Sequence, residues 1–514
     1  MSSVTHLQRP RKYASLWDAL GDPQIVASFL ILYCLLHFLL RLLLSPNYTL
    51  DESEQILFGQ SLEWGYRFRH PPLITWLSWA VLSSTGGSRV AFFLLKYVLM
   101  AGGLLAYFQA ARLVIRDDRL AGLATFGLLT TVSMGYMPHI DLMHTVLLAS
   151  MLAAYLWADA RVLTRGSWGD YVLLGVVAGL GILSKYIFVV LPIAMAIGTA
   201  CVPRLRAKLK IAPLLVALVI ALAIVAPYAW WAKTHEYSLF ALAETITKSQ
   251  GPALDVMGWL KGTGNLIVAL VGFVVPLIAI FPLLYWRACK PLGAAGSDDD
   301  RDWLRMYGIA MVAGALIMWG AVFFVGTEAF KERWMHQVAM ALPIWLFLRV
   351  KMAGAEGWSF ARGHRIFLWC AAIFALAVFA ARIAIYETGG NRCKVCREYW
   401  PMRAYAADFT RVGFFGGTIL SPTYDLAGNL RGVFPSARVV TPGYPLDVFG
   451  PKVPGQCLVV WEGTADIPKT ARDYLQGPMR TVIGRDAIRG DVTARLVTTK
   501  RMDTMSYLLL PKCG

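Results

Sequence analysis

The feature that most constrains this chain is a series of apolar runs, each about as long as a bilayer is thick. About 20 helical residues cross a hydrocarbon core of about 30 Å, because each residue of an α-helix adds about 1.5 Å. In lipid the backbone groups must bond within the segment, so each run is expected to be a helix. The sequence predicts a mainly α-helical membrane protein with eleven spans, at 25–44, 90–111, 120–137, 142–158, 171–184, 187–202, 211–231, 264–286, 306–325, 338–349 and 366–385.

The composition agrees with a polytopic membrane protein. Hydrophobic residues make up 57% of the 514 residues and charged residues 16%, whereas soluble proteins carry about 25% charged residues. The net charge of +17 would suggest a nucleic-acid partner in a soluble protein. Here basic cytoplasmic loops and attraction to lipid phosphates account for it, so we expect membrane lipids and no nucleic acid as partners.

The loops predict the orientation. Residues 1–24 are polar and basic and show no cleavable signal peptide, so we expect them in the cytoplasm. With that start, Lys and Arg concentrate in the loops on the inner side, as in the group Arg204, Arg206, Lys208 and Lys210. An odd number of spans then places the end of the chain outside. Arg41 and Lys96 fall within or near spans and need a partner or a path to the interface.

The segment 387–514 differs in kind from the transmembrane part, 25–386. It is rich in Gly, Pro, Arg and Asp and has no spanning run. Its patterns predict a small α/β domain outside the membrane. We expect strands at 417–421, 437–441 and 456–461, and helices near 402–412, 424–431 and 468–476.

Four of the eight cysteines lie in this segment, at Cys393, Cys396, Cys457 and Cys513. An oxidising compartment permits disulfides, and four cysteines allow three pairings. We favour Cys393–Cys396 together with Cys457–Cys513. The alternative is a redox or zinc motif at Cys393-Lys-Val-Cys396, which no second CxxC or nearby His accompanies.

The loop 45–89 holds the first of four polar clusters expected on the outer side. It opens with Asp51, Glu52 and Glu54, and its aromatic residues suggest helices lying in the membrane interface. Two adjacent carboxylates directly after a span suggest acid–base chemistry. The alternative is purely structural, with Asp51 as a helix N-cap and Glu54 completing a capping box.

The other three clusters lie at predicted turns on the same side. His139 and Asp141 precede a span, where Asp141 alternatively caps a helix. Lys185 and Tyr186 form the second, where the lysine alternatively reaches to the interface. Lys331, Glu332 and Arg333 form the third, alternatively a solvated loop with surface ion pairs. Together the clusters could supply a base from the acids and a counter-charge for phosphate from the cations.

In their order these motifs resemble the GT-C glycosyltransferases. The opening Asp51-Glu52-Ser53-Glu54 is followed by Gly65-Tyr66 and by His70-Pro71-Pro72. Gly179 to Tyr186 is similar to the Gly-Leu-x-x-Leu-Thr-Lys segment of the family, and Lys331-x-Arg333-Trp334 resembles its late basic-aromatic motif. The pattern is most similar to the lipid A aminoarabinose transferases and rhizobial lipopolysaccharide galacturonosyltransferases, and more distantly to the protein O-mannosyltransferases. Where the family often has Lys before Pro-Pro, this chain has His70.

The resemblance implies a GT-C fold with outer juxtamembrane helices, in a bacterial inner membrane with a periplasmic active site. It implies a polyprenyl-phosphate-linked sugar as donor and a lipid or glycan of the envelope as acceptor. Asp51 would be the base, and Glu52 and Asp141 would assist it. Lys185, Lys331 and Arg333 would bind the donor phosphate, and a neutral His70 would bind it poorly. Substrate-positioning roles would fall to Tyr66, His139, Tyr186 and Glu332.

The resemblance implies no required cofactor, although Asp51, Glu52 and Asp141 could supply oxygen ligands to a divalent cation. Three other functions stay open from the sequence. They are a lipid transporter or flippase, a receptor or assembly protein that acts through its soluble domain, and a ligase that uses diphosphate-linked donors. A transporter would show internal repeats and charges in the middle of spans, which are not evident here.

Overall fold

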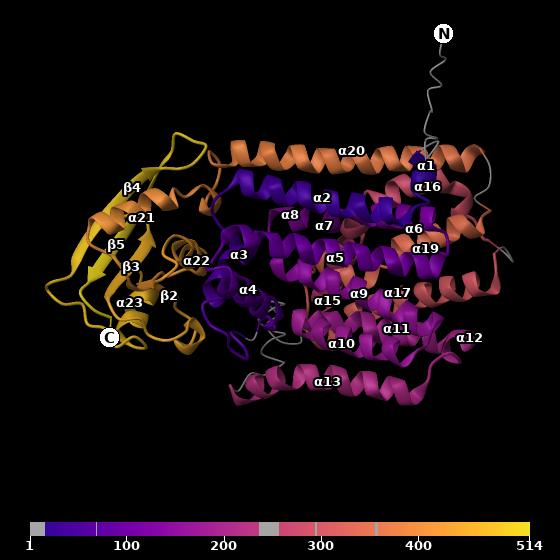
Figure 1. Cartoon of the computed structure of the whole chain (residues 1–514), viewed down its shortest axis with the longest axis horizontal. Coiled ribbons are helices and arrows are strands. Elements are labelled where there is room, and N and C mark those ends of the chain that lie inside the picture. Colours follow the sequence, from indigo (N-terminus) through magenta and orange to yellow (C-terminus); the bar gives the residue numbers. More distant parts are fainter. Residues whose placement is uncertain (1–15, 68, 236–255, 293–295, 355–357, 514) are drawn as a thin grey trace, which may run out of the picture.

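The computed structural model describes residues 16–67, 69–235, 256–292, 296–354 and 358–513. Its helices run along the long axis of the molecule, and a small sheet domain covers one end of them (Figure 1). Two large hydrophobic cores form, one in the helix bundle and one in the sheet domain. Leu57, Phe58 and Tyr66 of the first outer loop belong to the second core, so this loop joins the two parts.

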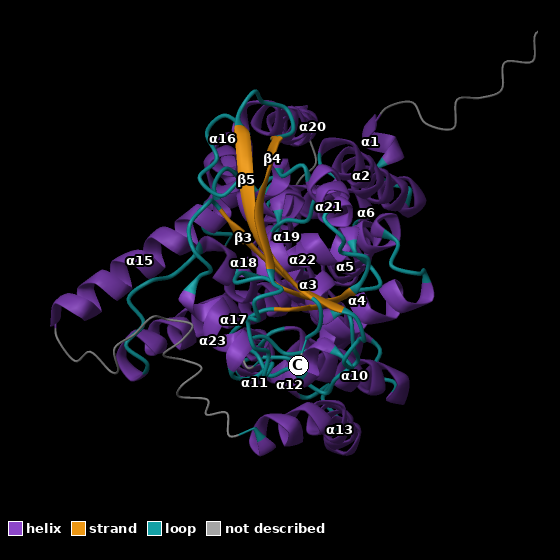
Figure 2. Cartoon of the chain, turned by 90° about the vertical axis from the view of Figure 1, so that its left-hand side faces the viewer, coloured by secondary structure: helices purple, strands orange, loops and turns teal. Residues whose placement is uncertain are grey.

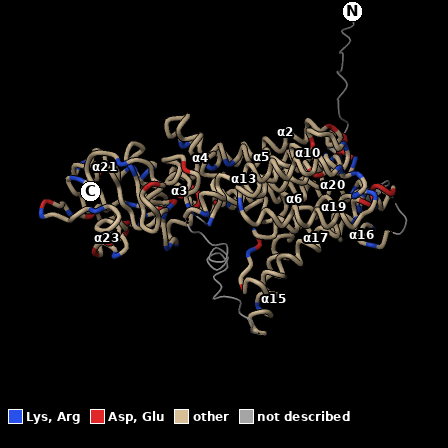
Figure 3. The backbone as a smooth tube through the Cα atoms, turned by 90° about the horizontal axis from the view of Figure 1, so that it is seen from below, with Lys and Arg blue, Asp and Glu red and all other residues tan. Residues whose placement is uncertain are grey.

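Seven described helices are long and apolar enough to cross a membrane. Their central part carries few charged residues, as expected for segments in contact with lipid (Figure 3). They correspond to seven of the expected spans, although their ends differ by several residues. They are α2 (Pro23–Leu44), α5 (Arg89–Ile115), α9 (Met143–Thr164), α13 (Ile211–Thr234), α15 (Val256–Val274), α17 (Asp298–Phe324) and α20 (Trp358–Gly389).

An eighth candidate span is sharply bent. The expected span 120–137 is split between α6 (Asp118–Leu129), α7 (Val132–Gly135) and α8 (Met137–Ile140), with an angle of 84° at the break. Thr130 and Thr131 occupy the break, and their hydroxyls donate to the carbonyls of Gly127 and Leu128 in the preceding turn. The expected span 142–158 lies within α9, a continuous helix of 22 residues.

The remaining three expected spans are helices shorter than a membrane span. Residues 171–184 lie in α10 (Trp168–Ser184), 187–202 in η1 (Tyr186–Val189) and α11 (Val190–Ala200), and 338–349 in α18 (His336–Ala339) and α19 (Leu342–Met352). The single span expected at 264–286 is also wrong. Its helix α15 ends at Val274, and α16 (Leu277–Cys289) begins after Pro276, whose nitrogen cannot donate a helical hydrogen bond.

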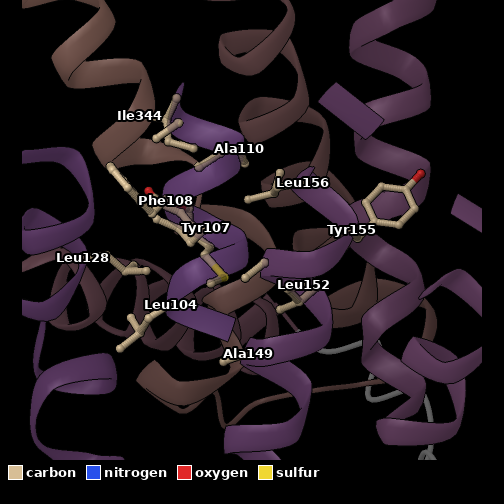
Figure 4. Close-up of a cluster of buried hydrophobic side chains, with 14 of the residues drawn as sticks. Leu104, Tyr107, Phe108, Ala110, Leu128, Ala149, Leu152, Tyr155, Leu156 and Ile344 are labelled. Carbon is tan, nitrogen blue, oxygen red and sulfur yellow. Dashed lines mark hydrogen bonds between the residues drawn. The ribbon is translucent and has the colours of Figure 1, made fainter. Parts of the chain in front are cut away.

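The bundle is organised around α5 and α9. Gly103 of α5 lies against Ser150 of α9, and a Cβ atom at Gly103 would lie 2.7 Å from the Cα of Ser150. Small residues at such a contact let two membrane helices approach closely. Above and below this contact, larger side chains such as Tyr107 and Leu152 fill the space between the helices (Figure 4).

The end of the bundle far from the sheet domain is rich in ion pairs (Figure 3). Short loops and the helices α1 (Leu16–Ala19) and α12 (Pro203–Arg206) lie there. Arg116 pairs with Asp299 and Asp300, and Arg204 pairs with Asp298. The sequence assigns these basic loops to the cytoplasm. The described start of the chain and the sheet domain lie at opposite ends of the bundle (Figure 1). This arrangement is compatible with the predicted orientation, in which the amino terminus is cytoplasmic and the sheet domain is outside.

The carboxyl-terminal domain has one five-stranded sheet in the order β2-β1-β3-β5-β4. The expected strands are β1 (Gly417–Leu420), β2 (Arg438–Val440) and β3 (Gln456–Glu462), which run parallel. Two further strands, β4 (Ile488–Arg495) and β5 (Met502–Leu510), were not predicted. β5 runs antiparallel to both of its neighbours, β3 and β4. The three expected helices are confirmed as α21 (Met402–Arg411), α22 (Tyr424–Val433) and α23 (Lys469–Gln476), and two short turns are η3 (Arg397–Tyr399) and η4 (Asp447–Phe449).

Both favoured disulfides are present. Cys393 bonds Cys396 within the linker after α20, and Cys457 on β3 bonds Cys513 after β5. The first closes the turn where the membrane part meets the sheet domain. The second ties the end of the chain to the central strand. The zinc alternative at Cys393 and Cys396 is wrong for this structure, because zinc binds free thiolates and both sulfurs are in the disulfide.

The sheet domain is docked on helix α3 (Leu50–Phe58) of the first outer loop. Figure 2 views the chain from the side of this domain, with α22 and α3 behind the sheet. Asn429 of α22 donates to the Tyr48 carbonyl (3.1 Å) and accepts from the Tyr48 amide (2.9 Å). Gln60 exchanges two hydrogen bonds of 2.8 Å with the backbone of Val439. These bonds hold the domain in one orientation on the bundle.

The substitution of Gly428 by alanine tests this docking. A Cβ atom at this position would lie 2.2 Å from the carbonyl oxygen of Ser53, so Gly428→Ala should force α22 away from α3. We expect a loss of stability of about 1–3 kcal/mol, typical of overpacking, and faster proteolysis between the two parts. Gly102→Ala is the matched control, because its Cβ meets no atom within 4 Å. Equal melting temperatures for the two variants in detergent would contradict the proposed contact.

Candidate active site

Helix α3 begins immediately after the first long helix. Its N-cap is Thr49, whose amide donates to the Glu52 carboxylate at 3.1 Å, so Thr49 and Glu52 form the capping box. The expectation that Asp51 is the N-cap and Glu54 its partner is therefore wrong by two residues. Asp51 is left in the first turn of the helix, where its side chain is partly exposed.

Glu52 is fully buried and holds two cations that come from membrane helices. Its carboxylate lies 2.6 Å from the Arg41 guanidinium of α2 and 3.0 Å from the Lys96 ammonium of α5. Burial opposes ionisation of this carboxyl, but the two positive charges outweigh it and lower its pKa. Arg41 and Lys96 thus have the partner that the sequence required. Glu52 therefore acts as a structural counter-ion for these two cations.

Asp51 and Asp141 form a close acidic pair. Asp141 follows α8 and accepts hydrogen bonds from the Thr49 hydroxyl (2.7 Å) and the Asp51 amide (3.1 Å). Burial and the neighbouring Asp51 carboxylate raise the pKa of Asp141 to about 7. Asp141 is therefore not the cap of α9, a position that Leu142 occupies with φ of 69°. It anchors the start of α3 instead.

Lys185 lies at the end of α10, on the other side of this pair. Its ammonium donates to the Thr145 hydroxyl at 3.4 Å. Burial lowers its pKa to about 8, the Asp51 charge opposes this, and three further cations add to the lowering. These cations are Arg333, Arg69 and Lys331. Asp51, Lys185, Lys331 and Arg333, which are far apart in sequence, thus act electrostatically on one another at one end of the bundle.

Glu54 and His70 of the first outer loop belong to a polar layer that also includes Arg67 and His144, which were not predicted as site residues. Glu54 pairs with Arg67 at 2.5 Å and with the His144 ring at 3.4 Å. His144 in turn stacks on His70, with ring centroids 4.0 Å apart. Burial lowers the pKa of His70 well below its usual value, so the ring is neutral. The sequence signal for this layer was the group of basic residues Arg67, Arg69 and His70 in the first outer loop.

The four expected substrate-positioning residues do not share one place. Tyr66 is buried in the loop and donates to the Ser61 carbonyl at 2.7 Å. His139 is buried among the membrane helices and bonds Tyr33 at 2.8 Å. Tyr186 bonds the hydroxyl of Tyr228, and Glu332 begins the short turn η2 (Glu332–Trp334) that carries Arg333. Of these, Tyr186 is next to Lys185 in sequence, and Glu332 lies between Lys331 and Arg333.

A wide cavity of about 660 Å³ is shared by the two parts of the protein and reaches the start of α3 at Leu50, the residue before Asp51. Leu50, Arg67 and Arg69 line it from the first loop. The loops after β1 and β2 line it from the sheet domain, with Tyr424, Asp425 and Tyr444. Ligands of α/β sheets commonly bind beyond the carboxyl ends of parallel strands. The sheet domain presents that end to the membrane part.

A metal site is not evident in this arrangement. Within the described residues, no group of three or more His, Cys, Asp or Glu side chains is arranged to hold a metal ion. The three acids suggested as oxygen ligands are divided, because Glu52 pairs with Arg41 and Lys96, Asp141 accepts from Thr49 and the Asp51 amide, and the Asp51 charge acts on Lys185. The arrangement provides acids and cations near an open cavity, which suits transfer of a group from a phosphate.

Comparison with known proteins agrees with this chemistry. Residues 69–231 match the family model described as dolichyl-phosphate-mannose-protein mannosyltransferase. The chain is 30% identical over 439 residues to the lipopolysaccharide core galacturonosyltransferase RgtA of Rhizobium johnstonii, covering 84% of this chain and 85% of that protein. The chain belongs to the GT-C glycosyltransferases.

A second curated relative and one solved structure are also similar to this glycosyltransferase. The lipopolysaccharide core galacturonosyltransferase RgtB of Rhizobium johnstonii is 29% identical, with 90% of this chain and 92% of that protein covered. Among solved structures, the archaeal oligosaccharyltransferase AglB from Archaeoglobus fulgidus, in complex with an inhibitory peptide and a dolichol-phosphate, superposes with a TM-score of 0.43 and 12% identity. The match covers 84% of this chain and 69% of that chain.

The neighbouring acids Asp51 and Glu52 give a direct test of their different surroundings. Glu52→Gln removes the counter-charge of Arg41 and Lys96 and leaves two buried cations, so we expect it to destabilise the glycosyltransferase by about 3–5 kcal/mol. Asp51→Asn, the matched control, should leave the melting temperature in detergent nearly unchanged. A Glu52→Gln variant as stable as Asp51→Asn would show that Glu52 is not a structural counter-ion.

Proposed function

We propose that this glycosyltransferase moves a sugar from a polyprenyl phosphate to an acceptor of the bacterial envelope, on the periplasmic face of the inner membrane. The observation that carries the proposal is the electrostatic coupling of Asp51 with Lys185, Arg333 and Lys331 at the end of the bundle that the sheet domain covers. By analogy with the named relatives, the sugar is a galacturonosyl unit and the acceptor lies in lipopolysaccharide.

The cationic residues suit a lipid-linked phosphate. Lys185 and Arg333 would hold the donor phosphate, with Lys331 contributing further positive charge. Arginine can bind phosphate oxygens in two places at once, whereas lysine contributes a compact charge. Because these residues lie at the ends of membrane helices, the prenyl chain could stay among the helices while its phosphate reaches the site.

The carboxylates suit activation of an acceptor hydroxyl. Asp51 would take the proton of the hydroxyl as its oxygen forms the new bond to the anomeric carbon. The bond from that carbon to the phosphate oxygen would break, leaving a prenyl phosphate whose added negative charge Lys185 and Arg333 stabilise. Asp141 would keep Asp51 in place through the start of α3. A single displacement of this kind inverts the anomeric centre.

The shared cavity suits the acceptor. Its wall includes Leu50, the residue before Asp51, and it is large enough for a sugar. Arg69 is an exposed cation on the same wall. Tyr424 of the sheet domain lies near enough to Asp51 for that charge to contribute to the raised pKa of its phenol, after the larger effect of burial. The sheet domain would therefore act as one wall of the acceptor site, which gives it a role in choosing the acceptor.

Transfer by the purified protein tests the proposal. With a monophosphate-linked prenyl galacturonic acid and lipopolysaccharide core as substrates, mass spectrometry should detect a product heavier by one sugar. Lys185→Met and Asp51→Asn should each reduce kcat/KM by about 10²–10⁴-fold, whereas the surface variant Lys469→Met should retain activity. Transfer only from a diphosphate-linked donor would point to a ligase, and lipid translocation without transfer would point to a flippase.

The pH dependence of kcat/KM follows from the two shifted groups. Asp141 becomes protonated as the pH falls through about 7. Loss of this neighbouring negative charge makes Asp51 a weaker base, so activity should fall on the acid side. Lys185 loses its proton as the pH rises through about 8, which removes charge from the phosphate site, so activity should fall on the alkaline side. Asp141→Asn should move only the acid limb to lower pH. An unmoved acid limb would exclude Asp141 from this role.

A further inference from the structure

A second polar cluster, away from Lys185 and Arg333, lies between the helices α2 and α20. These two helices run side by side along the bundle (Figure 1). Arg382 of α20 donates to the His37 ring of α2 at 2.9 Å, and His37 stacks on His139 with ring centroids 3.7 Å apart. All three side chains are nine-tenths or more buried. Placing a guanidinium among membrane helices is costly unless it has an anionic partner.

The anionic partner of Arg382 is not supplied by the protein. Among the described residues no carboxylate forms an ion pair with Arg382, whereas Arg41 and Lys96 share Glu52. The Nδ1 atom of His139 is also buried without a hydrogen-bond partner. Two buried polar groups on facing elements are thus available to a ligand that carries negative charge.

A hollow of about 50 Å³ lies beside these groups. Arg41, His139 and Arg382 line it, and Thr49 and Glu398 lie at its outer part. Glu398 is the acidic residue of the lining, and burial raises its pKa. The lining carries two cations, Arg41 and Arg382, and one acid, Glu398. Arg41 is paired with Glu52, whereas Arg382 has no carboxylate pair among the described residues. The hollow is suited in size to a small anionic group.

An apolar cavity of about 220 Å³ lies deeper between the same two helices. It is lined by Leu30 and Tyr33 of α2, by Phe126 and Leu129 of α6, and by Ala371 and Ala375 of α20. Tyr33 connects the two spaces, because it lines this cavity and bonds His139 at 2.8 Å. Phe29 beside it is 45% exposed, as expected at an opening to lipid.

The order of the two spaces along the helices matches a lipid of the outer leaflet. Arg382 precedes the end of α20 by seven residues, or about 10 Å. Ala375 and Ala371 lie another 7 to 11 residues back along the helix, about 10–17 Å deeper. An anionic headgroup at Arg382 would therefore have its chain directed into the apolar cavity, in the direction that a bilayer imposes.

We propose that the seam between α2 and α20 is a binding site for an anionic glycerophospholipid, whose phosphate bonds Arg382 and His139 and one of whose chains fills the apolar cavity. The inference is independent of the proposed transfer reaction. Charge complementarity decides the class of occupant, since a zwitterionic lipid brings no net charge to offset Arg382. The site also borders the catalytic acids, because Thr49 lines the hollow and donates to Asp141.

Native mass spectrometry of the detergent-purified full chain with added phosphatidylglycerol tests the headgroup contact. The wild type should retain one lipid molecule through mild activation, and Arg382→Gln should reduce the retained fraction by about tenfold. Arg382→Lys should restore part of the binding. Arg365→Gln is the matched control on the same helix, because Arg365 contacts only its own helix backbone at 3.4 Å, and it should bind as the wild type does.

The apolar cavity provides a second test that leaves the polar cluster intact. Ala375→Phe fills the cavity and should lower retention of phosphatidylglycerol, whereas Ala377→Phe, exposed on the same helix, should not. Equal retention by the wild type and Arg382→Gln, or equal retention of phosphatidylcholine and phosphatidylglycerol, would overturn the proposal. Retention of undecaprenyl phosphate in place of phosphatidylglycerol would also overturn it and would assign the seam to the prenyl lipid.

Discussion

The position of the site depends on one buried ion cluster. Glu52 offsets the charges of Arg41 from α2 and Lys96 from α5, so three segments meet at a single carboxylate. The same side chain completes the capping box of α3. The start of α3 is therefore fixed relative to the membrane helices, and Asp51, one residue earlier, is fixed with it. A buried charge retained in this way favours one arrangement of its neighbours, at the cost of desolvation.

From this fixed point the site extends in two directions. Toward the bundle, Asp141 accepts from Thr49 and from the Asp51 amide, and the cationic residues follow at the ends of other helices. Toward the outside, α22 packs on α3 so closely that only glycine fits at Gly428. The sheet domain is thus held against the same helix that carries Asp51. Disturbing α3 should alter the membrane part and the outer domain together.

The two polar regions of the bundle differ in how their charges are balanced. Around Asp51, a carboxylate and the cation Lys185 interact electrostatically, an arrangement suited to a charged substrate and to proton transfer. Between α2 and α20, Arg382 lies near the His37 and His139 rings and has no ion pair within the described part of the chain. That imbalance suggests a lipid anion as a permanent component of the folded protein, close to the catalytic acids but separate from the donor phosphate site.

Local sequence determined the features that depend on neighbouring residues, such as the length of an apolar helix. The lengths of the apolar runs predicted most membrane helices, and short apolar segments predicted three strands. The Asp51-Glu52 motif, with Lys185 and Arg333, predicted the family. Tertiary structure alone decided the rest. Adjacent carboxylates received different surroundings because consecutive helical residues point about 100° apart, so Glu52 is buried against two cations whereas Asp51 is partly exposed beside Asp141. The strand β4 escaped prediction because it is mostly exposed and shows weak patterning. The strand β5 is mostly buried, but its apolar run is confined to its end, Tyr507 to Leu510. The residues that complete the site, such as Tyr424 and Arg69, meet only through docking of the two parts, which no local pattern encodes.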